Sequence, residues 1–194
     1  IFFRRNTMVK ALCPVADGTE DIEFTNITDI LVRAGVEVVV ASVMTGKQVK
    51  LARGLNLVAD CMIDEVSAAD FDLVACAGGM PGAEHFQKSA KLNEIIVALK
   101  DAGKFYAAIC ATPAVCFSVN PKIMAGVTKA TSYPAFHGKL GESGVQVMTE
   151  RTVVDGKCVT SQGPATAMEF ALKLVELVVS PEKSAEISKA LLCA

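Results

Sequence analysis

The sequence FYAAICATP at residues 105–113 passes from an apolar run into the start of a helix. The run is typical of a buried strand and stops at Cys110, and Pro113 stands where a first helical turn tolerates proline. Ala108 and Ala111 are small enough to permit a sharp turn on either side of the cysteine. The segment therefore predicts a strand-to-helix elbow with Cys110 at its tip.

A cysteine at such an elbow has two interpretations. Free backbone N–H groups and the helix dipole favour a thiolate there, which would make Cys110 a reactive thiol with a lowered pKa. Alternatively, Cys110 is an ordinary core residue at a strand end, because free cysteines are usually buried. The local pattern leaves both interpretations open.

Outward from the elbow, buried strands alternate with helices. The β-branched run VEVVVASV at residues 36–43 is typical of a parallel strand covered on both faces. The same patterning predicts a helix at 20–34 with Thr19 as its N-cap. Further predictions are strands at 9–15, 71–77 and 104–109, shorter strands at 127–132, 145–148, 151–154 and 157–161, a small hairpin or edge excursion at 47–51 and 55–58, and helices at 90–102, 111–119, 165–178 and 181–192. This alternation predicts an α/β fold with a doubly wound, mostly parallel sheet and helices on both faces.

Composition limits the classes of partner. The 194 residues are 52% apolar and carry a net charge of −2, so no basic field favours nucleic acid or an anionic membrane surface. No apolar run approaches the roughly 20 residues of a membrane span. We expect a soluble single domain at 8–194, with 1–7 as a leader or cloning remnant; a short organellar presequence is the alternative for 1–7.

The seven cysteines have irregular spacing and form no C-x-x-C pair. A chain of this length and apolar content can bury a core without disulfides, so we expect reduced thiols in a cytoplasmic compartment. His85 and His137 are the only histidines and are expected in loops or on the surface. No zinc site is therefore predicted.

Two other predicted strand ends carry polar or glycine residues. Glu23 falls in the first turn of the helix at 20–34, where a carboxyl either compensates the helix dipole in solvent or, beside a thiol, carries a proton. Gly78 and Gly79 follow the strand at 71–77 and form either a tight turn or a backbone donor site for an oxyanion. Residue types alone leave these alternatives open.

Together, these segments resemble the ThiJ/PfpI superfamily, and most closely its parkinsonism-associated protein deglycase (DJ-one) family. The likeness covers Met8 to about Ala190. Its motifs are EDIE at 20–23, GG at 78–79, AAIC at 107–110, SQGP at 161–164 and EFA at 169–171. The resemblance implies a flavodoxin-like fold, a homodimer, and no metal or organic cofactor.

The resemblance also implies roles for individual residues. Cys110 would be the nucleophile and the oxidation-sensitive thiol, with Glu23 as its protonated neighbour. The amides of Gly79 and Ala111 would form the oxyanion site. The pocket would further include Gly78, Tyr133 and two arginines that match family positions near the dimer face and the pocket mouth, Arg33 and Arg53.

Departures from the family pattern narrow the range of activities that the resemblance implies. Protease-like members place His directly after the elbow cysteine, where this chain has Ala111, and amidotransferases supply a His near the chain end, where SQG at 161–163 has none. Tyr133 replaces a family His, and a tyrosine hydroxyl is a poor base at neutral pH. Val58 stands where the family has a second, peripheral cysteine.

Two functions of different class therefore compete. The first is an enzyme in which Cys110 attacks a small reactive carbonyl or a glycated substrate, as a glyoxalase or a protein deglycase. The second is an oxidative-stress sensor or redox chaperone in which peroxide converts Cys110 to a sulfinate. Both functions use the same pocket, but only the enzyme turns over a substrate.

Overall fold

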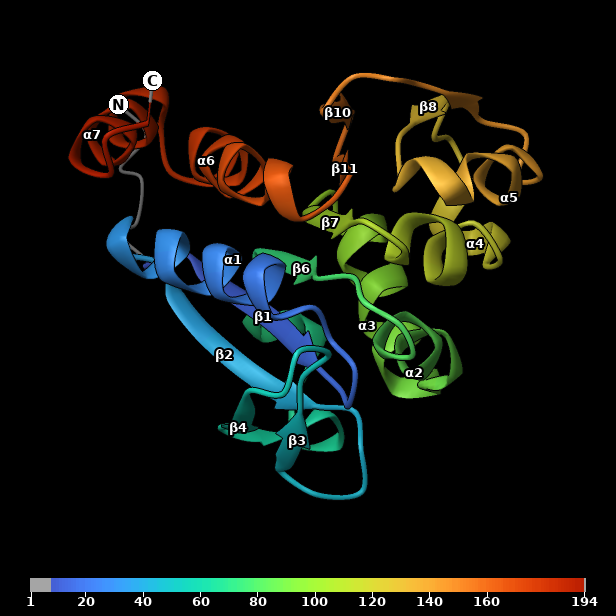
Figure 1. Ribbon diagram of the computed structural model, residues 1–194, viewed down its shortest axis with the longest axis horizontal. Helices are drawn as coiled ribbons and strands as arrows, with labels where there is room; N and C mark the ends of the chain where they lie inside the picture. The colour runs from blue at the N-terminus through green and yellow to red at the C-terminus, as the bar shows by residue number, and fades with distance from the viewer. Residues whose placement is uncertain (1–7, 194) are drawn as a thin grey trace.

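The computed structural model describes residues 8–193 and has a seven-stranded sheet at its centre (Figure 1). The strand order is β10-β11-β7-β6-β1-β2-β5, and only the β10–β11 pair is antiparallel. The strands are β1 (Lys10–Val15), β2 (Glu37–Ser42), β5 (Cys61–Met62), β6 (Leu73–Cys76), β7 (Phe105–Ile109), β10 (Thr152–Asp155) and β11 (Cys158–Ser161). The predicted doubly wound, mostly parallel α/β sheet is confirmed.

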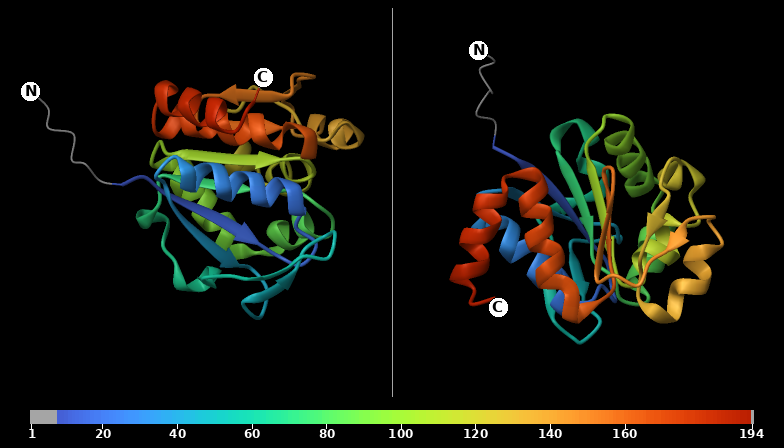
Figure 2. Two further views of the ribbon diagram at one scale, coloured as in Figure 1. Left: turned by 60° about the vertical axis from the view of Figure 1, so that its left-hand side comes forward. Right: turned by 90° about the horizontal axis from the view of Figure 1, so that it is seen from above.

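Helices cover both faces of this sheet, as the view from above shows (Figure 2, right). One face carries α1 (Asp21–Arg33), α6 (Ala167–Val178) and α7 (Pro181–Ala190). The other carries α2 (Gly82–Lys88), α3 (Ala90–Asp101), α4 (Pro121–Met124), α5 (His137–Gly141) and the π-helical turn η3 (Pro113–Phe117). Among residues 8–193, no helix is both long enough and apolar enough to cross a bilayer.

Burial on both faces of the sheet explains why the sequences of the central strands are unbroken apolar runs. In β6, Leu73 and Ala75 join the core beneath α1 and α6, whereas Val74 and Cys76 join the core beneath α3. All four side chains are at most 1% exposed. A strand covered on one face only would alternate apolar with polar residues.

Two small sheets lie outside the main one. The hairpin of β3 (Gln48–Lys50) and β4 (Asn56–Val58) is antiparallel, as predicted. The Asp21 carboxylate holds its tip by accepting bonds from the amides of Arg53 at 2.7 Å and Leu55 at 3.2 Å. The second sheet pairs β8 (Lys129–Ala130) with β9 (Gln146–Val147). Single 3-10 turns complete the chain at η1 (Ile63–Glu65), η2 (Ala68–Asp70), η4 (Pro134–Phe136) and η5 (Pro164–Thr166).

The structure corrects several sequence-based expectations. The segment predicted as a helix at 111–119 forms the shorter η3, and the strands predicted at 127–132 and 145–148 pair with each other outside the main sheet. Glu20, and not Thr19, caps α1 by accepting from the Glu23 amide at 2.9 Å. Thr19 instead accepts from the amide of Ala16 at 3.0 Å, which closes the turn after β1. The leader expected at 1–7 lies outside the described residues.

Candidate active site

Cys110 follows β7 and has a φ of +66°, a left-handed conformation that non-glycine residues rarely adopt. Two backbone hydrogen bonds hold Cys110 in this conformation: its amide donates to Ser161 O at 3.0 Å, and its carbonyl accepts from Tyr133 N at 2.8 Å. Thr112 ties the elbow to β6 by donating from its hydroxyl to Ala77 O at 2.6 Å. Strain held in place at a single residue is typical of functional sites. The structure thus places Cys110 at the sharp elbow that the sequence predicts.

Glu23 projects from the first turn of α1 toward this elbow and is fully buried. Its Oε2 accepts from the Gly78 amide at 2.7 Å, and its carboxyl also contacts the Cys110 thiol. Oε1 has no nitrogen or oxygen hydrogen-bond partner among the described residues. Burial raises the pKa of Glu23 to about 7, although the bond from Gly78 opposes the shift. The solvated alternative for Glu23 is therefore wrong.

The pKa of Cys110 corrects the expectation of a lowered value. Burial raises it to about 12, and the negative charge of ionised Glu23 adds to the increase. The backbone amides of Gly79 and Ala111 face the sulfur and lower the pKa, which is the direction predicted for an elbow. Their effect is smaller than that of desolvation and the neighbouring charge. A thiolate is therefore disfavoured while Glu23 is ionised.

Gly78 and Gly79 let the loops after β1, β6 and β7 touch without side chains between them. A Cβ on Gly78 would lie 2.5 Å from the Cβ of Cys110 and 2.8 Å from Oε2 of Glu23. Gly79 has a φ of +89° and abuts the backbone of Gly18 and Glu20. The glycines are required for close approach at the site, a stronger constraint than the tight turn that the sequence offered as an alternative.

Tyr133 and the carboxyl of Glu23 both lie close to Gly163. A Cβ on Gly163 would lie 3.2 Å from Tyr133 Cδ2 and 4.0 Å from Glu23 Oε1, so the ring packs tightly against this glycine and the carboxyl lies within contact distance of the same position. The tyrosine is 45% exposed. A cavity of about 190 Å³ opens at this point, lined by Tyr133, Pro134, Arg151, Gln162, Gly163, Pro164, Ala165 and Thr166.

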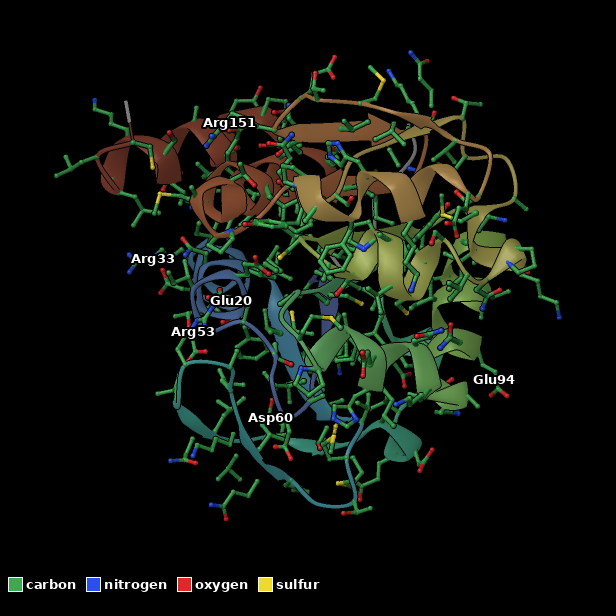
Figure 3. The ribbon with its side chains drawn as sticks, turned by 45° about the vertical axis from the view of Figure 1, so that its right-hand side comes forward. Glu20, Arg33, Arg53, Asp60, Glu94 and Arg151 are labelled. Atoms are coloured by element: carbon green, nitrogen blue, oxygen red, sulfur yellow. The ribbon has the colours of Figure 1, made fainter. Side chains whose placement is uncertain are left out.

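The two predicted pocket arginines lie elsewhere in this chain. Arg33 is near the C-terminal end of α1, about 15 Å along the helix from Glu23, and pairs with Asp29 at 2.7 Å. Arg53 is exposed at the β3–β4 tip, where only its backbone bonds to Asp21 are defined. Figure 3 shows both arginines at the periphery beside α1. Neither forms part of the cavity at Tyr133.

The remaining polar residues define what else the site can do. His85 lies in α2, the Nε2 of His137 is 3.0 Å from Ser132 O, and neither histidine is among the groups that shift the pKa of Glu23 or Cys110. Among residues 8–193, no three His, Cys, Asp or Glu side chains converge as a metal site would require. Sequence reasoning missed Thr112 as an anchor and the contact of Gly163 with Tyr133. A threonine three residues after the end of β7 is the one signal that pointed to the first of these.

Comparison with known proteins places this geometry in a family. The DJ-1/PfpI family matches residues 9–177. Protein DJ-1 homolog B of Arabidopsis thaliana is 40% identical over 181 residues, 93% of this chain but only 40% of that protein, so the chain spans less than half of this relative. The glutathione-independent glyoxalase DJR-1.2 of Caenorhabditis elegans is 33% identical, covering 93% of each chain. The structure of oxidized Toxoplasma gondii DJ-1 superposes with a TM-score of 0.90 at 42% identity, covering 96% of this chain and 99% of that one. The chain belongs to the DJ-1/PfpI family.

Proposed function

We propose that the protein is a cysteine-dependent, glutathione-independent glyoxalase that converts small 2-oxoaldehydes such as methylglyoxal into 2-hydroxy acids. The observation that carries this proposal is the contact between the Cys110 thiol and a fully buried Glu23 carboxyl with one unpartnered oxygen. A nucleophile with an adjacent proton carrier is the arrangement that this isomerisation needs. The name of the Caenorhabditis elegans relative supports the same activity.

The thiolate forms when the proton of the pair resides on Glu23. With Glu23 neutral, its negative charge no longer opposes ionisation of Cys110, and the amides of Gly79 and Ala111 still favour the anion. Two groups that interact this strongly titrate as a unit, and the pair holds one proton over a broad pH range. The reactive microstate is therefore thiolate plus protonated carboxyl.

Each chemical step can be assigned to these groups. The sulfur attacks the aldehyde carbon, and the new oxyanion is held by the amides of Gly79 and Ala111 and takes the proton of Glu23, giving a hemithioacetal. The Glu23 carboxylate then removes the proton from the former aldehyde carbon and returns it to the adjacent ketone carbon, while the hydroxyl proton of the hemithioacetal moves to the former ketone oxygen. The resulting thioester is hydrolysed by water, which releases the 2-hydroxy acid and the Cys110 thiol. The aldehyde carbon is oxidised as the ketone carbon is reduced, so no external oxidant is consumed.

The same nucleophile would release early glycation adducts from amino groups or thiols, which is deglycase chemistry. Protease and amidotransferase activities are disfavoured because no histidine contacts Cys110.

The test of the glyoxalase measures the loss of methylglyoxal and the appearance of lactate with three proteins: the wild type, Cys110→Ser and Cys116→Ser. Cys116 is a buried core cysteine and serves as the matched control. Turnover that persists in Cys110→Ser would refute the glyoxalase.

A redox-sensing role is the second candidate, favoured by the same protonated carboxyl. One peroxide converts the thiolate to a sulfenate and water, and a second yields a sulfinate, which a proton on Glu23 would stabilise by a hydrogen bond. The oxidised form would then alter partner binding or chaperone-like activity. Intact mass after mild peroxide should show two added oxygens at Cys110 before any other thiol. Oxidation spread evenly over all seven cysteines would exclude the sensor.

The proposal includes a homodimer and a cytoplasmic location. Four apolar side chains of α1 and the hairpin are at least half exposed, which is costly unless another surface covers them: Ile22, Val32, Leu55 and Val58. Arg33 lies too far along α1 to reach Cys110 of its own chain, so a second copy is required for it to approach a pocket. All seven cysteines are free thiols, which suits a reducing compartment.

A further inference from the structure

Tyr133 makes the mouth of the site aromatic where a family histidine would make it polar. Its ring lies 6.4 Å from that of Phe136, centroid to centroid, at an interplanar angle of 59°. Pro134 and Pro164 also line the cavity. With 45% of Tyr133 exposed, part of the ring is free to meet a ligand.

The cavity beside Tyr133 is lined by neither Cys110 nor Glu23, and Gly163 is the lining residue that lies close to the Glu23 carboxyl. Glu23 Oε1 is unpartnered, fully buried, and lies close to the same glycine as the tyrosine ring. A 2-oxoaldehyde attached to Cys110 and in contact with Glu23 would therefore direct its substituent past Gly163 toward Tyr133. The cavity volume of about 190 Å³ exceeds the roughly 150 Å³ apolar cavity known to hold benzene.

The charged residue in this cavity does not favour an anionic substituent. Arg151 donates from Nε to Glu169 at 2.8 Å and from Nη2 to Ala165 O at 2.8 Å. The carboxylate of Glu169 thus balances its charge. Its planar guanidinium can still stack on a neutral ring.

We propose that Tyr133 is a specificity-determining residue that selects 2-oxoaldehydes with an aryl substituent over those with a methyl group. An aromatic pair contributes attraction beyond buried area, in an offset-stacked or edge-to-face arrangement. A methyl group has no ring face or edge to contribute to such a pair. The inference rests on the proposed glyoxalase function and adds a substrate class to it.

The test compares kcat/KM for phenylglyoxal and methylglyoxal, with the Cys110→Ser rate subtracted to remove reaction with arginine. The wild type should favour phenylglyoxal, and Tyr133→Phe should retain this preference. Tyr133→Ala and Tyr133→Leu should lower the phenyl-to-methyl ratio about threefold to tenfold. Val119→Ala, an exposed apolar truncation beyond the far end of η3, is the control and should leave the ratio unchanged.

A second measurement separates this inference from the glyoxalase itself. Rates of Cys110 alkylation by N-phenyliodoacetamide and by iodoacetamide, followed by peptide mass, need no turnover. Loss of the phenyl preference in Tyr133→Ala and Tyr133→Leu supports the aromatic subsite even if no oxoaldehyde is consumed. Ratios that stay at the wild-type value in both variants, in turnover or in alkylation, overturn it.

Discussion

At the scale of single residues, Glu23 couples the stability of the protein to pH. Its pKa rises from an ordinary 4.5 to about 7 on folding, so the folded state holds a proton that the unfolded state has released. The contribution of Glu23 to the free energy of unfolding is therefore fully present below about pH 4.5. It is lost as the pH rises through 7, and the total loss is about 3 kcal/mol. We expect Glu23→Gln to be more stable than the wild type at pH 8 and to lose this dependence, as measured by urea denaturation at pH 5 and pH 8.

The control for this prediction is Glu94→Gln, an exposed carboxyl on α3 across the sheet, which should keep the wild-type slope. The same Glu23→Gln protein should also titrate its Cys110 thiol about 1–3 pH units lower, because a negative charge beside the sulfur is gone. An unchanged thiol titration would contradict the contact between the two side chains, whatever the stability shows.

Residue patterns could predict the place of Cys110 but not its ionisation. The strand end, the small neighbours and the proline after them are local signals, and they located the elbow. The pKa depends on burial and on a carboxyl 87 positions away along the chain, neither of which a local pattern contains. The separation of Arg33 from Glu23 is different: it was already contained in the predicted helix at 20–34, because ten helical residues span about 15 Å.

At the scale of elements, the elbow after β7 depends on a bond to β6. Thr112 is fully buried and donates to Ala77 O at 2.6 Å, so Thr112→Val would leave that carbonyl unpaired in the core. We expect a loss of about 1–3 kcal/mol in unfolding free energy and a changed rate of Cys110 alkylation. Thr112→Ser retains the hydroxyl and should restore both. Equal stability of the Val and Ser variants would show that the bond contributes nothing.

The long, strongly patterned elements could be predicted from the sequence, and the short ones could not. The β-branched run at β2 and the apolar stripe of α3 each carry a periodicity long enough to read. By contrast, α4 and β5 are four and two residues long, and α2 follows a glycine-rich turn that hides its start. The strands β8 and β9 were found, but their pairing outside the main sheet depends on tertiary contacts. One such contact is the Asp155 carboxylate, which accepts from the amides of Thr128 and Lys129.

At the scale of the whole molecule, the apolar side chains left exposed on α1 and the hairpin predict self-association. Ile22 is 52% exposed and Val58 is 70% exposed, on two elements that the Asp21 carboxylate holds together. A second copy related by a two-fold axis would cover this surface with itself, since such an interface is self-complementary. We expect sedimentation velocity to give a dimer for the wild type and a monomer for Ile22→Glu combined with Val58→Glu, because buried unpaired carboxylates oppose association. Val119→Glu, at a surface away from α1, should remain a dimer, and a wild type that sediments as a monomer at all concentrations would refute the assembly.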